Sequence, residues 1–307
     1  MPQVRGLHHV TAVTASAPGN LAFWRDVLGL RFVKKTVNFD DPTVYHLYYG
    51  DELGRPGSAM TFFAWEDMAP GRRGAGEVAE TQLAVPAGAI AWWGERLATA
   101  GCDTDRATRF GEPRLAFRDP DGLDLALVEA ADDTRAPWTT DTVTADVAIR
   151  GFHGVTLALA DTAPTAALLT GLMDYGGRDD EGGLVRLHAS AGSAARVVDL
   201  TPTSSSPARL GAGSVHHVAF SVADRAAQDA VRAALVDAGF QVTPPIDRDY
   251  FHAIYFRTPG GVLFEVATDA PGFTVDEPAA KLGTSLKLPR QHEHLRAELE
   301  RTLPPLG

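Results

Sequence analysis

The sequence predicts an α+β fold of four β-α-β-β-β modules that pair into two domains, each an open, barrel-like sheet with its helices outside. Two observations carry this prediction. Four amphipathic helix patterns recur along the 307 residues, with helix-ending glycines at Gly29, Gly101, Gly176 and Gly239. Each helix pattern lies between short segments of alternating polarity that are rich in β-branched residues, which is typical of half-buried strands.

The first module shows the repeating unit most clearly. A strand pattern over residues 6–14 precedes a helix pattern over residues 20–32, and three further strand patterns follow at residues 30–39, 44–50 and 58–65. The turn-forming sequences DDPT and DELGRPG separate the last three strands. The order is therefore one strand, one helix and three strands.

The same order repeats three times further along the chain. Strand patterns precede each remaining helix pattern, at residues 80–86, 151–159 and 214–222. The helix patterns themselves cover residues 89–103, 164–177 and 225–242. A sheet of about four strands with one helix leaves its other face bare, so the modules must pair to bury apolar surface.

A polar, turn-rich stretch at residues 132–142 separates modules two and three and is typical of a linker. We therefore expect an N-terminal domain of modules one and two, residues 1–135, and a C-terminal domain of modules three and four, residues 145–270. The tail, residues 271–307, carries a short charged helix pattern, and we expect it to wrap back on the body.

The composition argues against several classes of function. The formal net charge of −11 disfavours a nucleic-acid partner, because such binding relies on clustered Lys and Arg. No apolar run approaches the ~20 residues of a membrane-spanning helix, and no export signal is visible at the start, so we expect a cytoplasmic protein. The single cysteine, Cys102, fits a reducing compartment and a packing role.

The residues with the clearest chemical potential lie on the first and last strands of the modules. The first strands of modules one and four carry the pairs His8-His9 and His216-His217 at equivalent positions. Neighbouring strand residues point to opposite faces, so one histidine of each pair faces the concave side. Glu265 stands in the otherwise apolar strand VLFEVA, where burial of a carboxylate requires a cation.

If modules one and four share a cavity, four positions face into it: His9, His217, Glu265 and Thr61. Two imidazoles and one carboxylate form a facial triad, which suits non-haem Fe²⁺ and leaves up to three positions for substrate and oxygen. Mn²⁺ accepts the same ligands. The equivalent positions elsewhere hold Gln82, Ala126 and Gly154, so we expect one site. The alternative is that both histidine pairs are hydrogen-bonded core residues.

Several longer runs carry a family resemblance: LHHVT, FVKKTVNFDDPTVYHLYYGDELGRPGSAMTFF, VHHVAF and YFRTPGGVLFEVATD. They resemble the vicinal oxygen chelate superfamily, which includes glyoxalase and bleomycin resistance proteins, and in particular its hydroquinone ring-cleaving dioxygenases. The similarity covers nearly the whole chain, including LGTSLKLP in the tail.

The resemblance implies a ring-cleaving dioxygenase that acts on a small aromatic compound with O2. It implies metal ligation by His9, His217 and Glu265, and it leaves open whether the chain forms a homo-oligomer. It also implies that five further residues surround the substrate: His8, Thr11, His216, Arg248 and Tyr255.

Two rival functions stay open at this point. A metal-dependent isomerase or lyase of the glyoxalase kind shares the scaffold, but it uses four protein ligands, usually with a second glutamate, where this chain has Thr61. A metal-free protein that binds aromatic compounds would use the same cleft. The sequence also leaves open a catechol rather than a hydroquinone substrate.

Overall fold

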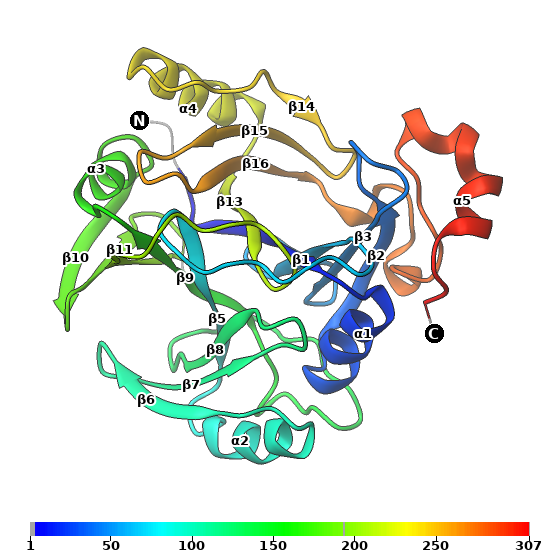
Figure 1. Cartoon of the computed structure of the whole chain (residues 1–307), viewed down its shortest axis with the longest axis horizontal. Helices are drawn as coiled ribbons and strands as arrows, with labels where there is room; N and C mark the ends of the chain where they lie inside the picture. Colours follow the sequence, from blue (N-terminus) through cyan, green and yellow to red (C-terminus); the bar gives the residue numbers. More distant parts are fainter. Residues whose placement is uncertain (1–3, 193, 307) are drawn as a thin grey trace.

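The computed structural model describes residues 4–192 and 194–306, and it contains the four expected β-α-β-β-β modules (Figure 1). Module one consists of β1 (Leu7–Thr14), α1 (Ala17–Leu21) with a π-helical continuation (Ala22–Val27), β2 (Arg31–Val37), β3 (Tyr45–Gly50) and β4 (Ala59–Ala64). Module two consists of β5 (Glu77–Val85), α2 (Ile90–Thr99), β6 (Asp105–Arg109), β7 (Glu112–Arg118) and β8 (Asp124–Glu129).

The second half of the chain repeats this order. Module three consists of β9 (Gly151–Leu159), α3 (Ala163–Leu172), β10 (Tyr175–Glu181), β11 (Leu184–Ala189) and β12 (Val197–Pro202). Module four consists of β13 (Val215–Val222), α4 (Arg225–Asp237), β14 (Ile246–Asp247), β15 (Phe251–Arg257) and β16 (Leu263–Pro271). The tail holds three short 3-10 turns (Phe273–Val275, Ala279–Lys281, Arg290–Leu295) and α5 (Arg296–Thr302).

The helix ends follow local sequence signals. Asp224 caps α4 by accepting a hydrogen bond from the backbone N–H of Ala227, and Gly239 follows the helix with a φ of 90°. The prediction for the third helix differs in detail. Gly176 lies within β10 rather than at the helix end, and Asp174, with a φ of 57°, takes the left-handed position, which short polar side chains tolerate.

The strands form two eight-stranded sheets that pair the modules across the two halves of the chain. One sheet has the order β14-β15-β16-β13-β1-β4-β3-β2, and the other has the order β10-β11-β12-β9-β5-β8-β7-β6. The expected domains follow chain order, with modules one and two in the first and modules three and four in the second, whereas each sheet joins the two halves of the chain, module one with module four and module two with module three.

The physical reason is that each module leaves its first strand as an open edge, which can pair with the first strand of any other module. The edges of modules one and four meet as the antiparallel pair β1–β13, and those of modules two and three meet as β5–β9. The division of the chain into an N-terminal domain, residues 1–135, and a C-terminal domain, residues 145–270, stays a prediction.

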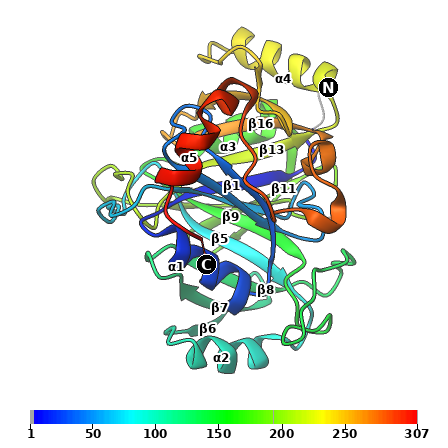
Figure 2. The same cartoon turned by 90° about the vertical axis from the view of Figure 1, so that its right-hand side faces the viewer.

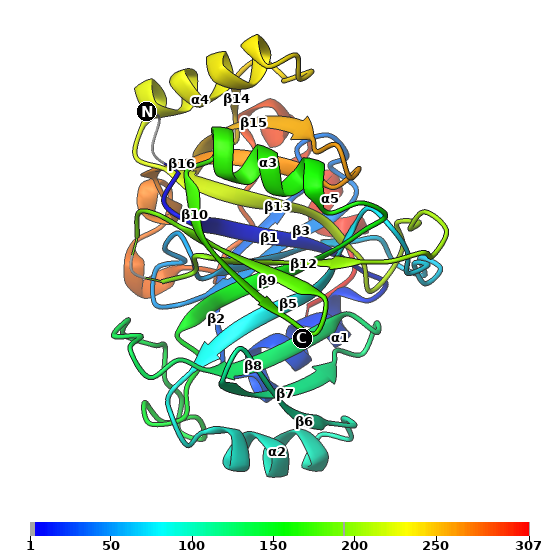
Figure 3. The ribbon, with the colours of Figure 1, turned by 90° about the vertical axis from the view of Figure 1, so that its left-hand side faces the viewer.

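The helices lie on the outside of the sheets. Figures 1 and 3 show α2 at one end of the molecule and α4 at the opposite end, with the strands between them. Trp24, in the π-helical continuation of α1, and Trp93, in α2, are fully buried and belong to one apolar core that reaches both sheets. None of the helices in the described residues is long and apolar enough to cross a membrane.

The tail returns to the free edge of the first sheet. Lys287 donates a backbone hydrogen bond of 2.9 Å to the carbonyl of Lys35, and Leu286 forms a parallel bridge with the same residue of β2. Figure 2 shows α5, in red, in front of the strands on this side of the molecule. The tail therefore covers an edge that would otherwise be open to pairing with another chain.

Candidate metal centre

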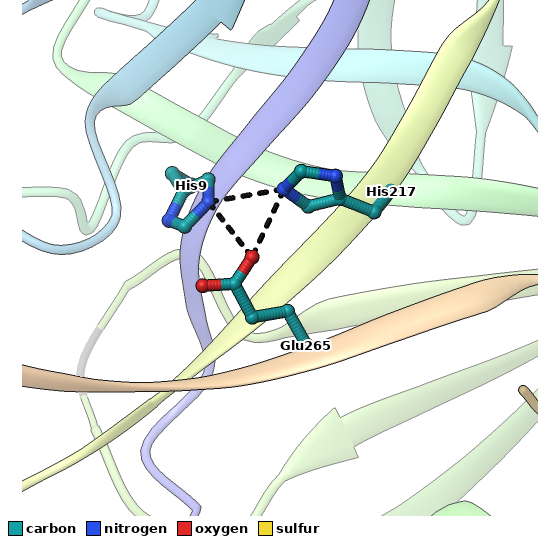
Figure 4. A group of neighbouring side chains, drawn as sticks. All are labelled: His9, His217 and Glu265. Atoms are coloured by element: carbon teal, nitrogen blue, oxygen red, sulfur yellow. Dashed lines mark hydrogen bonds and ion pairs between the residues drawn. The ribbon is translucent and has the colours of Figure 1, made fainter. Parts of the chain in front are cut away.

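Three side chains from three adjacent strands converge at the centre of the first sheet (Figure 4). His9 comes from β1, His217 from β13 and Glu265 from β16. The Nε2 atoms of the two histidines are 3.3 Å apart, and they lie 3.3 Å and 3.0 Å from Glu265 Oε2, respectively. These atoms are close enough for all three side chains to ligate one ion.

Glu265 gives the clearest sign that the site suits a cation. The residue is completely buried, and neither carboxylate oxygen accepts a hydrogen bond from the described residues. Burial opposes ionisation of this carboxyl, but the adjacent His9 and His217 outweigh it and hold its pKa well below the usual value. A buried, ionised carboxylate is costly unless a positive charge balances it, so this set of ligand atoms fits a bound divalent metal.

His9 and His217 are each hydrogen-bonded to the histidine that precedes them in the sequence. His8 Nδ1 lies 2.9 Å from His9 Nδ1, and His216 Nδ1 lies 2.8 Å from His217 Nδ1. If Nε2 of His9 and of His217 is to bind a metal, the proton of each ring must sit on Nδ1 and be donated to the preceding histidine. The first histidines can thus fix the orientation and tautomer of the second ones.

These preceding histidines are held neutral. Burial, together with the neighbouring His9, lowers the pKa of His8 to about 3. Burial and the neighbouring His217 lower the pKa of His216 to about 3 as well, and burial also lowers the pKa of His217. Neutral rings can accept the protons donated by the candidate ligands.

A cavity of about 400 Å³ opens in front of the triad, a size typical of small-molecule sites. His9, His217 and Glu265 contribute to its wall, and His216, Arg248 and Tyr255 line it as well. His8 and Thr11 do not line it. His8 borders a smaller cavity of about 160 Å³, and Phe251 lines both cavities.

Two of the lining residues, Arg248 and Tyr255, bring hydrogen-bond donors to the cavity wall. Arg248 lies in the turn between β14 and β15; its Nε donates to Tyr255 Oη at 3.3 Å, and its guanidinium lies 3.4 Å from Asp40 Oδ2. Burial, reinforced by the charge of Glu265, raises the pKa of Tyr255 well above its usual value. Tyr255 is therefore a protonated hydroxyl at neutral pH.

The sequence reasoning missed other residues that line the cavity, above all His46 and Tyr48 on β3. Their spacing of two residues within the expected strand places them on one face of the sheet, and this was the available signal. Burial lowers the pKa of His46 well below its usual value, so its ring is neutral. The remaining cavity wall is mostly aromatic or acidic: Asn38, Phe39, Asp40, Asp41, Phe63, Trp65, Phe251 and Leu263.

Thr61 occupies the place where a fourth ligand would come from. Its hydroxyl lies 2.7 Å from Thr11 Oγ1 and 2.9 Å from His46 Nε2. Thr61 is completely buried, and its hydroxyl is engaged by these two neighbours. The side chain therefore acts within a hydrogen-bonded row, and the candidate centre has three ligands from the protein.

The second sheet also contains a buried carboxylate, but an arginine balances its charge. Asp199 on β12 pairs with Thr156 of β9, as Glu265 on β16 pairs with Ala219 of β13. Asp199 is completely buried and accepts hydrogen bonds from Arg186, at 2.7 Å and 2.9 Å, and from Gln82, at 2.9 Å. The guanidinium supplies the positive charge here. Among residues 4–192 and 194–306, the triad is the one group of three suitable side chains.

Comparison with known proteins agrees with this architecture. A family model for the Glyoxalase/Bleomycin resistance protein/Dioxygenase superfamily matches residues 6–127 and again residues 131–266. The chain belongs to this superfamily. The resemblance seen in the sequence motifs is thereby confirmed.

Similarity to individual proteins extends over nearly the full chain. The chain is 44% identical over 300 residues to the "Putative ring-cleaving dioxygenase MhqO" of Bacillus subtilis (strain 168), covering 98% of this chain and 96% of that protein. It is 37% identical over 310 residues to a chlorohydroquinone/hydroquinone 1,2-dioxygenase of Sphingobium indicum, covering 98% of this chain and 96% of that protein.

Solved structures of superfamily members share the fold. A crystal structure from B. subtilis, described as that of a "putative dioxygenase", superposes with a TM-score of 0.97 at 43% identity and covers 100% of this chain and 99% of its own. Glyoxalase I from Zea mays superposes with a TM-score of 0.64 at 14% identity, over 86% of this chain and 92% of its own. The second match concerns the fold alone.

Proposed function

We propose that this chain is a non-haem iron(II) dioxygenase that opens a hydroquinone-type aromatic ring with O2. The observation that carries the proposal is the buried three-ligand centre of His9, His217 and Glu265, which faces a mostly aromatic cavity. Such a facial triad leaves adjacent positions for a phenol and for O2. The full-length similarity to a hydroquinone 1,2-dioxygenase supports the substrate class.

In this proposal, the metal would acidify a coordinated phenol and carry electrons from the ring to O2. The chain supplies the surroundings for that chemistry. His8 and His216 hold the ligand imidazoles in one tautomer, and the positive charge of Arg248 stabilises anionic oxygen in the cavity. Tyr255 keeps its proton and can donate a hydrogen bond to a bound oxygen atom.

Both rival functions are less well supported. A glyoxalase-like isomerase would require a fourth ligand, usually a carboxylate, but the hydroxyl of Thr61 is already bonded to Thr11 and His46. A metal-free binding protein would leave the buried charge of Glu265 to be balanced by His9 and His217 alone, although burial disfavours the charged form of His217. The choice of iron over manganese, and of a hydroquinone over a catechol, is part of the proposal.

The proposal also includes the setting of the enzyme. Its partners are a small aromatic compound and O2, and the acidic net charge of −11 is unsuited to nucleic acid. Cys102 is half-buried, and burial raises the pKa of its thiol, which fits a packing role in a reducing cytoplasm.

The direct test is anaerobic reconstitution with Fe²⁺ or Mn²⁺, followed by measurement of oxygen uptake with hydroquinones and catechols. We expect uptake with hydroquinones in the iron-loaded protein and ring-opened products by mass spectrometry. Uptake with catechols alone would move the assignment to catechol cleavage. A metal-loaded protein that consumes no oxygen with any phenol would contradict the proposal and favour isomerase chemistry.

A pair of variants tests the choice of ligands. His217→Ala should abolish both metal retention and turnover, because it removes one of three ligands. His153 occupies the position in module three that is equivalent to His8 and His216. His153→Ala should leave metal retention and turnover nearly intact, because this imidazole lies in the other sheet, 3.2 Å from Glu112. Metal content and oxygen uptake provide the measurements, and equal losses in the two variants would contradict the assignment.

A further inference from the structure

A row of four hydrogen-bonded side chains runs across three strands beside the candidate metal ligands. Thr11 Oγ1 on β1 lies 2.7 Å from Thr61 Oγ1 on β4, which lies 2.9 Å from His46 Nε2 on β3. His46 Nδ1 in turn lies 2.9 Å from Tyr48 Oη on the same strand. The row begins at a completely buried threonine and ends at a tyrosine that lines the main cavity.

The buried end of the row decides the direction of its hydrogen bonds. Thr11 does not line the cavity, and within the described residues Thr61 is the hydrogen-bond partner of its hydroxyl. A buried hydroxyl proton without an acceptor is costly, so Thr11 donates to Thr61. Thr61 then has its own proton free to donate to His46 Nε2.

The imidazole of His46 determines which group donates in its hydrogen bond with Tyr48. A neutral histidine carries one N–H and one bare nitrogen, so a ring that accepts at Nε2 must carry its proton on Nδ1. His46 therefore donates to Tyr48 Oη, and the hydroxyl proton of Tyr48 is left for a third partner. Because Tyr48 lines the cavity, a molecule bound there can accept this hydrogen bond.

We propose that Tyr48 is a specificity-determining residue that donates a hydrogen bond to a ring oxygen of the substrate other than the oxygen nearest the metal ligands. This inference rests on the proposed function, since a hydroquinone-type ring carries a second oxygen. Much of the cavity wall is aromatic, including Phe39, Phe63 and Trp65. A donor held in one orientation at this point of the wall selects ring orientation, because an analogue that lacks the matching oxygen leaves the donor unpaired.

The direction of the row can be tested by NMR on the metal-free protein labelled with ¹⁵N-histidine, with His46 assigned from a His46→Gln variant. We expect a proton on Nδ1 and a bare Nε2. Thr61→Ser, which keeps the hydroxyl, should preserve this tautomer, whereas the nearly isosteric Thr61→Val should release it. A proton on Nε2 in the unmodified protein would overturn the proposed direction.

The role of Tyr48 can be tested by binding two phenols of similar shape to the iron-loaded protein under anaerobic conditions. 4-Methoxyphenol carries a second oxygen that accepts a hydrogen bond, and 4-ethylphenol does not. We expect the protein to bind 4-methoxyphenol about fivefold more tightly, and we expect Tyr48→Phe to remove this preference. Absence of a preference in the unmodified protein, or its persistence in Tyr48→Phe, would overturn the assignment.

A neighbouring tyrosine provides the control. Tyr49 is buried on the other face of β3, where its hydroxyl donates to Asn20 Oδ1 at 3.0 Å, and Tyr49→Phe should keep the preference. Both measurements are made without O2 and without turnover. A protein that binds with the expected preference but cleaves no ring would therefore contradict the proposed function and leave the assignment of Tyr48 standing.

Discussion

Buried carboxylates in this chain are accommodated by different neighbours. Glu265 lies among the imidazoles of a candidate metal centre, and Asp199 is held by Arg186. Among the described residues, no basic side chain pairs with Asp119, and its Oδ1 accepts backbone hydrogen bonds from Asp121 and Leu123. Burial raises the pKa of Asp119 to about 7, although the two backbone hydrogen bonds oppose the shift.

This raised pKa predicts a pH dependence of stability. The folded state holds the Asp119 proton up to about pH 7, whereas the unfolded chain releases it near 3.8, so ionisation reduces the free energy of unfolding as the pH rises through this interval. Asp119→Asn removes the titration. The free energy of unfolding of the variant, relative to that of the unmodified protein, should therefore rise between pH 4 and 7, by about 4 kcal/mol at most.

Urea unfolding at several pH values measures this difference. The comparison is a slope, so a constant change in stability from the new amide group does not affect it. A difference that is flat from pH 4 to 7 would show that Asp119 titrates normally in the folded protein.

At the scale of elements, the edge strand β2 depends on the tail that covers it. Lys34 on β2 has a completely buried side chain, whose Nζ lies 2.6 Å from Asp276 Oδ1 and also contacts Glu277. The same ammonium lies 5.0 Å from the ring centroid of Tyr250, whose hydroxyl donates to Asp276. A single buried charge thus connects the sheet edge, module four and the tail.

Removing that charge should be costly. Lys34→Met keeps most of the side-chain volume but leaves Glu277 buried and unpaired, so we expect a loss of about 3 kcal/mol in the free energy of unfolding. The double variant with Glu277→Gln should recover part of the loss. Lys35→Met is the matched control, because the Lys35 side chain is less buried and its hydrogen bond with the tail comes from the backbone.

Urea unfolding of the four proteins gives the free energies. The control should stay within about 0.5 kcal/mol of the unmodified protein. Equal losses from Lys34→Met and Lys35→Met would show that the ion pairs of the tail contribute nothing beyond packing.

For the whole molecule, the candidate ligands come from opposite ends of the sequence and meet across the β1–β13 seam. His9 belongs to module one, whereas His217 and Glu265 belong to module four. A metal bound by all three would connect the two modules that form the first sheet. Binding to the folded state alone adds stability according to the ratio of free metal to dissociation constant.

Metal removal should therefore lower the melting temperature. At a free metal concentration 100-fold above the dissociation constant, the expected stabilisation is about 2.7 kcal/mol. Calorimetry of the protein with Fe²⁺ under anaerobic conditions and after chelation measures the shift, with His217→Ala as the control. An equal shift in that variant would mean that the ion binds elsewhere.

Much of this molecule could be predicted from local pattern. Period-two alternation and helix-ending glycines predict the four modules, and the carboxylate of Glu265 in an apolar strand predicts a nearby cation. The positions of His46 and Tyr48 in the cavity wall were not predicted, because β3 is rich in aromatic residues and its inward side chains look like ordinary packing residues. Thr11 matched a family motif, yet the structure places its hydroxyl against Thr61 and away from the cavity.

The sequence by itself determined the repeating unit and the chemical types available to the site, because alternation, capping and the cost of burying charge act over a few neighbouring residues. Only the tertiary structure decided which modules share a sheet and which side chains form the hydrogen-bonded row from Thr11 to Tyr48. Strand edges of similar composition can pair in several ways. The choice among them depends on the burial of the whole core, which is not encoded in any one segment.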